Sequence, residues 1–330
     1  MISVSTAKSI FNNFSKIKVL VIGDIMFDHY IWGTVSRISP EAPVPIVHIT
    51  RESKMPGGAA NVAANLHSLG VNTGILGIVG RDDRGKFLKN YFKQKKIDTR
   101  ALTTDSRRPT TEKIRIIAHS QQVVRVDREK KLDFSKAEKK ALKQKIKRFG
   151  PLYDAIILED YGKGILDQEI IDSVLTLKKK KPSLVISYDP KKGNDLKMHN
   201  IDFGTPNLSE ALSIVEKRTT LKMGTTPDEI GKALRKRWHA RSIFLTLGEK
   251  GMIVIEKGKT NFCIPTVARE VYDVSGAGDT VIATATASLA AGATLRQAAI
   301  LSNYAAGIVV GKIGTQTVKP EEILKKVNSQ

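Results

Sequence analysis

The chain has 330 residues, of which 41% are hydrophobic and 26% charged, as in an average globular protein, so a disordered, collagen-like or coiled-coil chain is a poor description. Lysine and arginine outnumber aspartate and glutamate by 54 to 33, and the net charge of +21 keeps a nucleic-acid-binding protein as an alternative. Cys263 is the single cysteine and the six histidines are scattered, which excludes an internal disulfide and argues against a structural zinc site.

The N-terminal segment has no apolar run of the kind that forms the core of a signal peptide. No stretch of the sequence reaches 18 consecutive apolar residues, the length that a membrane-spanning helix needs. We therefore expect a cytoplasmic protein that does not act at a membrane.

Short apolar runs alternate with helical patterns along most of the chain, which predicts a doubly wound α/β sheet with mostly parallel strands. The predicted strands are residues 18–23, 74–79, 155–158, 184–187 and 242–247. The predicted helices are residues 59–69, 86–95, 134–148, 168–179, 227–238 and 278–290.

Two segments depart from this alternation. Residues 31–49 contain three prolines among β-prone residues, and residues 109–127 alternate apolar and polar side chains as antiparallel strands do. We expect these segments to form a small accessory sheet, or lid, inserted in one domain that spans residues 1–330.

Residues 80–87, GRDDRGKF, almost match the P-loop pattern of nucleotide-binding proteins. Phe87 stands where that pattern needs a hydroxyl to hold Mg²⁺, and Asp82 and Asp83 put negative charge where phosphates would lie. We therefore predict an ordinary turn and helix start here.

The segment Asp273–Thr280, DVSGAGDT, is the strongest functional signal in the sequence. Its small residues Gly276, Ala277 and Gly278 let backbone N–H groups approach an anion, and a helix starting there adds its positive end. Asp279 follows in the first helical turn. This arrangement suits phosphoryl transfer, in which the backbone stabilises the moving phosphoryl group and the aspartate accepts the proton of the attacking hydroxyl. A plain capped helix is the structural alternative.

The chain resembles the ribokinase-like (PfkB) carbohydrate kinases over nearly its whole length. The segments that carry the resemblance are, in order, GDIMFDHY (23–30), PGGAANVAANLHSLG (56–70), GRDDRG (80–85), DYGKG (160–164), DPK (189–191), TPNLSE (205–210), TLGEKGM (246–252) and DVSGAGDT (273–280). Residues 36–47, 109–116, 121–127 and 307–318 look like those of bacterial D-glycero-β-D-manno-heptose 7-phosphate kinases, in the form without an attached nucleotidyltransferase. Glu159 departs from the small residue that relatives often have before DYGKG.

The resemblance implies a three-layer fold with a β lid, a requirement for ATP and Mg²⁺, and a role for each matching residue. Asp279 matches the catalytic base, and Gly276, Ala277 and Gly278 match the anion hole. Asn207 and Glu210 match a pair that holds Mg²⁺ through water; the same pair also fits an N-terminal helix cap, and both interpretations are compatible.

The sugar and nucleotide sites follow from the same matches. The expected sugar-binding residues are Asp24, Asp28, Gly57, Gly58 and Asn61. Nucleotide contacts are expected from Asn207, Thr246, Gly248, Gly251 and Asn303. Lys191 is the preferred anchor for a phosphate on the sugar, with Arg37, Arg125 and Arg128 as other candidates. For Asp273, the resemblance implies a part in the monovalent-cation loop that some relatives have.

The function that the resemblance implies is phosphorylation of the anomeric hydroxyl of D-glycero-β-D-manno-heptose 7-phosphate, for the supply of lipopolysaccharide-core heptose. The alternatives are a related kinase with another sugar or sugar phosphate, an inactive relative, and, more distantly, a nucleic-acid-binding protein. Exposed lid edges also suggest a homodimer. We expect no nucleic acid and no membrane as partners.

Overall fold

The computed structural model describes residues 2–119, 121–130, 134–217, 224–268 and 272–329. Its largest element is an eight-stranded sheet in the order β14-β13-β12-β11-β10-β9-β1-β4. The six neighbouring strands β12, β11, β10, β9, β1 and β4 are parallel to one another. At the other edge of the sheet, β13 pairs antiparallel with β12, and β14 pairs antiparallel with β13. In chain order these strands are β1 (Lys18–Gly23), β4 (Asn72–Leu76), β9 (Ala155–Glu159), β10 (Val185–Asp189), β11 (Phe203–Gly204), β12 (Ser242–Thr246), β13 (Met252–Glu256) and β14 (Phe262–Ile264).

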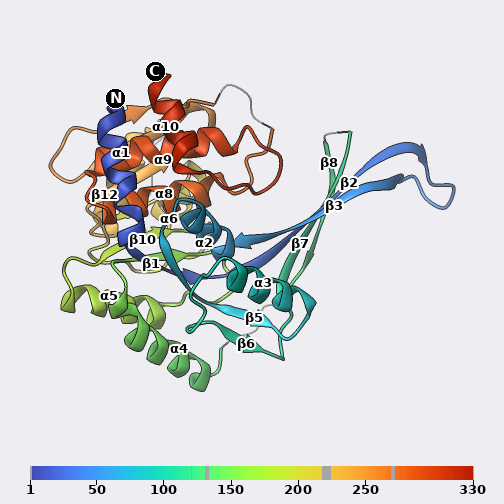
Figure 1. The fold of residues 1–330 in the computed structure, drawn as a ribbon, viewed down its shortest axis with the longest axis horizontal. Helices are drawn as coiled ribbons and strands as arrows, with labels where there is room; N and C mark the ends of the chain where they lie inside the picture. Colours follow the sequence, from blue (N-terminus) through green and yellow to red (C-terminus); the bar gives the residue numbers. More distant parts are fainter. Residues whose placement is uncertain (1, 120, 131–133, 218–223, 269–271, 330) are drawn as a thin grey trace.

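Helices cover both faces of this sheet and produce three layers (Figure 1). One core cluster contains side chains of α1 (Val4–Asn12), α2 (Ala59–Ser68), α3 (Asp83–Gln94), α8 (Ala277–Ala290), α9 (Leu295–Val309) and α10 (Pro320–Asn328). The other contains side chains of α4 (Lys136–Phe149), α5 (Gln168–Lys180), α6 (Leu208–Glu216) and α7 (Pro227–Arg237). Three short 3₁₀ helices lie after α1, α4 and β12, respectively: η1 (Phe14–Lys16), η2 (Gly150–Leu152) and η3 (Gly248–Lys250). The predicted doubly wound α/β architecture is confirmed.

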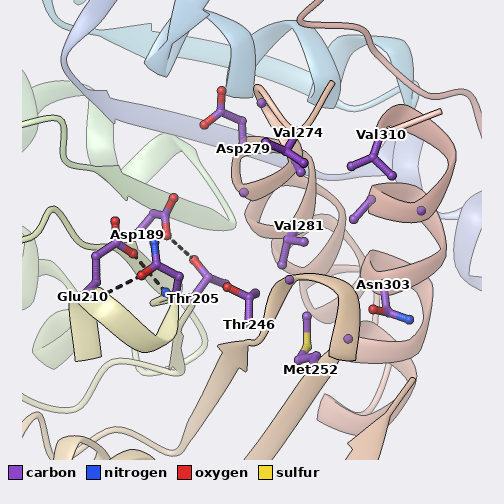
Figure 2. A pocket seen from close by; sticks show the side chains of 18 of the residues that line it. Asp189, Thr205, Glu210, Thr246, Met252, Val274, Asp279, Val281, Asn303 and Val310 are labelled. Atoms are coloured by element: carbon purple, nitrogen blue, oxygen red, sulfur yellow. Dashed lines mark hydrogen bonds between the residues drawn. The ribbon is translucent and has the colours of Figure 1, made fainter. Parts of the chain in front are cut away.

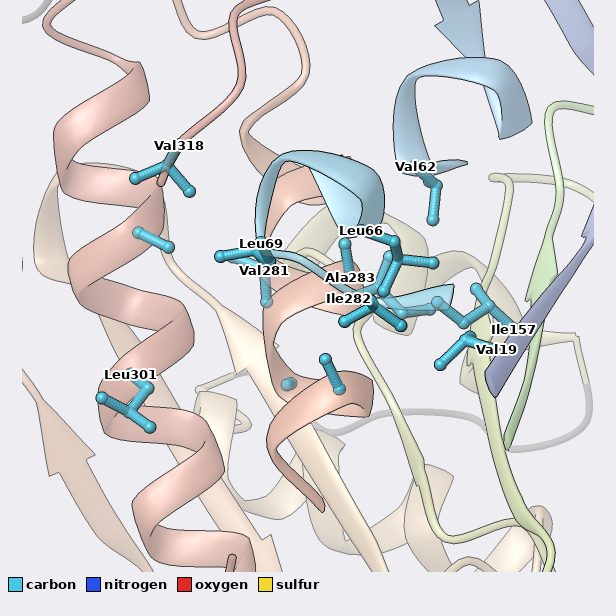
Figure 3. Packing of buried hydrophobic residues seen from close by; sticks show 14 of the residues in the cluster. Val19, Val62, Leu66, Leu69, Ile157, Val281, Ile282, Ala283, Leu301 and Val318 are labelled. Carbon is cyan, nitrogen blue, oxygen red and sulfur yellow. The ribbon is translucent and has the colours of Figure 1, made fainter. Parts of the chain in front are cut away.

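Strand β1 shows why the strands have continuous apolar runs. Val19 and Val21 belong to the core cluster on the α2 and α8 side, and Leu20 and Ile22 belong to the cluster on the α5 side. Figure 3 shows Val19 beside Ile157 of β9 in the first of these clusters, which also contains Leu66 of α2. Because both faces are buried, alternate positions have no reason to be polar.

A second, four-stranded sheet projects from the body as an arm (Figure 1). Its order is β3-β2-β7-β8, with β2 and β3 forming a long antiparallel hairpin and β2 pairing with β7 in parallel. The strands are β2 (Ile25–Ile38), β3 (Pro45–Gly58), β7 (Thr111–Ala118) and β8 (Gln121–Arg128). The accessory sheet predicted from residues 31–49 and 109–127 is present, and β2 and β3 extend it to Ile25 and Gly58. Residue 120 lies outside the described residues.

The predicted strand 74–79 is wrong in one respect, because it is two strands. β4 ends at Leu76 in the main sheet, whereas β5 (Ile78–Gly80) pairs with β6 (Thr103–Asp105) in a separate two-stranded sheet. Between them, a Cβ on Gly77 would lie 2.6 Å from Ile25 Cδ1 and 2.8 Å from the carbonyl oxygen of Gly23. The chain changes partner at a close approach that only glycine permits, which an apolar pattern does not reveal.

The P-loop-like segment 80–87 forms the end of β5 and the start of α3, as predicted. Asp82 is the N-cap of α3 and accepts hydrogen bonds from the backbone N–H groups of Gly85 and Thr110, both at 2.8 Å. The carboxylate thus completes a helix cap in place of a phosphate site.

Within the described part of the chain, no helix has both the length and the apolar character that crossing a bilayer requires.

Candidate active site

A cavity of about 680 Å³ lies at the carboxyl ends of β9, β10 and β12 and against the first turn of α8 (Figure 2). This edge is where doubly wound sheets bind their ligands. The cavity brings together these sequence-predicted residues: Lys191, Asn207, Glu210, Thr246, Gly248, Gly251, Gly276, Ala277, Gly278, Asp279 and Asn303. It does not include these others: Asp24, Asp28, Gly57, Gly58 and Asn61.

Asp279 lies in the first turn of α8 and is 2% exposed. Its Oδ2 accepts a hydrogen bond from Asn61 Nδ2 at 2.6 Å, and its Oδ1 accepts one from the Tyr161 hydroxyl at 2.9 Å. Burial raises the pKa of the Asp279 carboxyl to about 6, and these two hydrogen bonds oppose that rise. Asn61 therefore connects the predicted sugar-binding residues to the cavity, and the carboxylate is held in one orientation.

The backbone before Asp279 requires glycine. Gly276 is the N-cap of α8 with φ of +79°, and a Cβ there would lie 2.7 Å from Asn61 Nδ2. A side chain at this position would therefore strain the turn and push against the amide that holds Asp279. The positive end of α8 meets the cavity at this turn, as an anion site requires.

Asp28 lies on β2 in the small sheet and is 3% exposed. Arg115 of β7 donates a hydrogen bond from one guanidinium nitrogen to Asp28 Oδ1 at 2.8 Å. Burial raises the pKa of Asp28, and the positive charge of Arg115 acts in the opposite direction. A Cβ on Gly57 would lie 2.7 Å from Asp28 Oδ2, so glycine leaves the space that the carboxylate occupies.

Asp24 has a different environment. Its side chain is 2% exposed, and its carboxylate accepts three backbone hydrogen bonds from the N–H groups of Tyr161, Lys163 and Ile165, at 3.0, 2.9 and 3.2 Å. Gly58 lies beside it with φ of +56°, and a Cβ there would lie 2.6 Å from the carbonyl oxygen of Asp24. Asp24 thus anchors the loop after β9, and its direct contact with a sugar stays a prediction.

Asn207 and Glu210 form the predicted capping box at the start of α6. Asn207 Oδ1 accepts a hydrogen bond from the Glu210 N–H, and Glu210 Oε2 accepts one from the Asn207 N–H, both at 2.9 Å. Both residues also line the cavity, and each of these oxygens has a second lone pair. The cap is confirmed, and the oxygen atoms fit a hard cation held through water.

The opposite end of the cavity is more apolar (Figure 2). The predicted turn at 246–251 is the connection between β12 and β13, where Gly251 has φ of +86° and a Cβ would lie 2.0 Å from the carbonyl oxygen of Ile264. Asn303 of α9 donates a hydrogen bond to the Pro265 carbonyl oxygen at 2.8 Å. The aliphatic side chains of Met252, Val274, Val281 and Val310 also line the cavity. An apolar surface with few polar groups is typical of a site for a flat ring such as adenine.

The four basic candidates for a phosphate anchor occupy different places. Lys191 lines the cavity, and its Nζ lies 5.4 Å from the centre of the Tyr161 ring. Arg37 is exposed on β2, Arg125 pairs with Asp127, and Arg128 lies 3.6 Å from a Glu112 oxygen. None of these three arginines lines the cavity.

Asp273 accepts hydrogen bonds from the Ser275 and Gly314 N–H groups, and its role in a cation loop stays a prediction.

Sequence reasoning did not single out several residues of the site. Tyr161 and Asp189 stand in the segments DYGKG and DPK, but only the structure shows that Tyr161 binds Asp279 and that Asp189 lines the cavity. Arg115 belongs to the alternating pattern of β7, and the parallel pairing with β2 is what brings it to Asp28. The alternation of apolar and polar side chains in that segment is the sequence signal from which the side of the sheet that Arg115 faces could have been predicted.

Comparison with known proteins supports one family. Residues 16–322 match the model of the pfkB family carbohydrate kinases. The bifunctional protein HldE of Helicobacter pylori strain J99 is 42% identical over 314 residues, and that of a Nitratiruptor species is 41% identical over 309 residues. The match covers 94% and 93% of this chain, and 66% and 64% of the respective relative, so the chain spans about two thirds of their length.

Solved structures show the same fold. An Arabidopsis thaliana ribokinase complexed with ribose and ATP aligns with a TM-score of 0.69 at 17% identity, over 94% of this chain and 98% of that one. Phosphofructokinase-2 from Escherichia coli in complex with substrates and products aligns with a TM-score of 0.74 at 17% identity, over 95% of this chain and 99% of that one. The ribokinase-like fold is confirmed, and the chain belongs to the pfkB family of carbohydrate kinases.

Proposed function

We propose that this kinase transfers the γ-phosphoryl group of ATP to the anomeric hydroxyl of D-glycero-β-D-manno-heptose 7-phosphate, giving the 1,7-bisphosphate for the lipopolysaccharide core. The observation that carries phosphoryl transfer is Asp279, buried and oriented at the N-terminus of α8 beside the cavity. The heptose assignment is supported by the resemblance of residues 36–47 and 109–127 to heptose kinases and by the HldE relatives.

In this proposal Asp279 accepts the proton of the attacking hydroxyl, and the hydroxyl oxygen attacks the γ-phosphorus in line with the leaving ADP oxygen. The N-terminal turn at Gly276, Ala277 and Gly278 stabilises the charge that develops on the phosphoryl group. Asn207 and Glu210 would hold Mg²⁺ through water. The positive charge of the ion would offset the negative charge of the phosphates. The nucleotide base would lie on the apolar side near Asn303.

Asp28, Gly57 and Asn61 would bind the sugar, with Lys191 as the anchor for its phosphate. The small sheet would cover the sugar and exclude water, which limits hydrolysis of ATP. Its edge strand β8 exposes Val123, Val124 and Val126 by 41 to 46%, and an exposed apolar edge favours pairing with a second copy. We therefore propose a homodimer, and a cytoplasmic site of action where ATP is available.

A panel of sugars and sugar phosphates tests the substrate. With ATP and Mg²⁺, we expect turnover of the heptose 7-phosphate, and phosphorus NMR of the product should show a new phosphate on the anomeric carbon. The panel includes ribose, adenosine and fructose 6-phosphate. Turnover of one of these without turnover of the heptose would replace our assignment by a related kinase.

Replacing Tyr161 by phenylalanine should slow the reaction. The variant loses the hydrogen bond to Asp279 Oδ1, and a bond to a charged group contributes about 1.5–3 kcal/mol, so kcat should fall about ten- to a hundredfold. Because this bond lowers the pKa of Asp279, its loss raises that pKa. The base is active when ionised, so the acid limb of the pH profile of kcat/KM should move to higher pH.

Tyr153→Phe is the matched control, because the Tyr153 hydroxyl donates a 2.9 Å hydrogen bond to Asp98 outside the site. We expect its kcat and pH profile to match those of the unmodified protein. If the two phenylalanine variants have the same kinetics, Tyr161 does not position Asp279.

A further inference from the structure

A second cavity, of about 520 Å³, shares no lining residue with the active-site cavity. It is lined by residues from the second half of α3 and from the segment 96–104, which leads from α3 into β6 (Figure 1). We call this cavity the α3 groove. The proposed reaction uses none of its residues. The basic and polar side chains that line it are those of Lys89, Lys93, Lys96, Asn90, Thr99 and Thr104.

The three groove lysines form no ion pair within the described part of the chain. The carboxylates nearest to them in sequence pair with other cations. Asp83 lies 3.0 Å from the ammonium nitrogen of Lys86. Asp98 forms an ion pair of 2.6 Å with Arg100 and also accepts a hydrogen bond from the Tyr153 hydroxyl. The positive charge of the groove is therefore not neutralised by these neighbours.

Helix stability does not account for this set of lysines. Lys89 and Lys93 are four residues apart on α3, a spacing at which like charges repel. Of the three, only Lys93 stands in the last turn, where a cation interacts favourably with the negative end of the helix. Lys96 follows the C-cap residue Lys95 with φ of +52°, at a position where glycine is the usual residue. The helix end explains one lysine, but not three at one cavity.

We propose that the α3 groove binds a small anion that carries two or more phosphate groups. Ammonium groups bind phosphate oxygens as point charges, and the amide of Asn90 and the hydroxyls of Thr99 and Thr104 can donate further hydrogen bonds. A single phosphate group carries a charge of about −1.5 to −2 at pH 7, which is less than the charge of three lysines. A diphosphate or triphosphate offsets that charge more completely.

The lining of the groove favours a small anion over a nucleic acid. None of the described residues that line it is aromatic, whereas sites for single-stranded nucleic acid stack the bases on aromatic rings. The half-buried side chain of Leu102 also lines the groove and offers apolar surface to an organic group beside the phosphates. The proposed anion is therefore either a free polyphosphate or the phosphate part of a nucleotide.

The proposal is tested by acylating the lysines of the whole protein in the presence of inorganic triphosphate and measuring each lysine by mass spectrometry. A bound anion shields an ammonium group and holds its proton, which slows acylation. Lys136 and Lys140 of α4 are internal controls, because both are exposed and form no ion pair in the described part of the chain. We expect half-protection of the groove lysines at about a tenfold lower triphosphate concentration than for these controls, since isolated surface charges are screened by salt.

A variant with both Lys89→Gln and Lys93→Gln removes two charges of the groove. Protection of Lys96 should then require about tenfold more triphosphate, because one cation remains where three acted together. The matched variant, Lys136→Gln with Lys140→Gln, removes the same charge from α4 and should leave the protection of Lys96 unchanged. Equal unfolding temperatures of the two variants show that both are folded.

Three results would overturn the proposal. The first is equal protection of the groove and control lysines, which means general attraction to a basic surface. The second is equal protection by sodium chloride at the same ionic strength. The third is unchanged protection of Lys96 in the groove variant. The first two results need only the unmodified protein.

A parallel titration with ADP distinguishes the two sources of the phosphates. Protection at a lower concentration of ADP than of triphosphate supports a nucleotide in the groove, and the reverse order supports a free polyphosphate. Because the readout is the acylation of the groove lysines, binding of either anion in the active-site cavity does not affect it. The sugar panel and this footprint therefore fail independently.

Discussion

Asp279→Asn is expected to lower kcat about 10³-fold or more, because general base catalysis contributes about 10²- to 10⁴-fold and the amide cannot accept a proton at neutral pH. The fold should remain intact. The amide oxygen can still accept the hydrogen bond from Asn61, and its NH₂ group can donate to the Tyr161 hydroxyl, which can turn to accept. Steady-state kinetics with ATP and the sugar phosphate measure the effect.

The control for this variant is Asp83→Asn, since Asp83 is also an aspartate in the first turn of a helix, α3, and its side chain is 92% exposed. Its kcat should be unchanged. ATP binding measured by calorimetry should be similar for both variants and the unmodified protein. Near-normal turnover in Asp279→Asn would show that Asp279 is not the base.

Asp24→Ala should have the largest effect on stability. The substitution leaves three backbone N–H groups of the loop 161–165 without their acceptor, and each unsatisfied buried donor costs about 1–3 kcal/mol. We expect the free energy of unfolding to fall by about 3 kcal/mol or more, as measured by urea denaturation.

Two comparisons sharpen the test of Asp24. Asp24→Asn keeps one acceptor oxygen and should lose less stability than Asp24→Ala. Asp154→Ala removes a carboxylate that accepts a single, exposed backbone hydrogen bond from Lys18, and should cost about 1 kcal/mol or less. If Asp24→Ala and Asp154→Ala lose the same stability, the buried anchor has no special role.

The sequence predicted the structure best where the residues that determine a local structure all lie within one short segment. Residues 18–23 were predicted as a strand with the bounds that β1 has, because a strand buried on both faces is apolar throughout. The segment around Asp279 predicted a helix start beside an anion site, and α8 begins at Ala277. The cap of α6 followed from Asn207 and Glu210 alone.

Prediction was weaker where a contact depends on a distant segment. The break at Gly77 depends on how close Gly23 and Ile25 come, and neither is near in sequence. Arg115 reaches Asp28 only because β7 pairs with β2. The burial of Glu159 likewise depends on its neighbours in the sheet; in the sequence it is visible only as a departure from the family pattern.

The place of β2 in the small sheet has a mechanical consequence. β2 is hydrogen-bonded on both sides, to β3 and to β7, so Asp28 and Arg115 belong to one stiff unit built from two separate parts of the chain. Asp279 belongs to α8, which packs on the main sheet. Any tilt of the small sheet about its base changes the distance between Asp28 and Asp279. In the proposed sugar site, simultaneous contact of a sugar with both carboxylates would therefore depend on the angle between the two sheets.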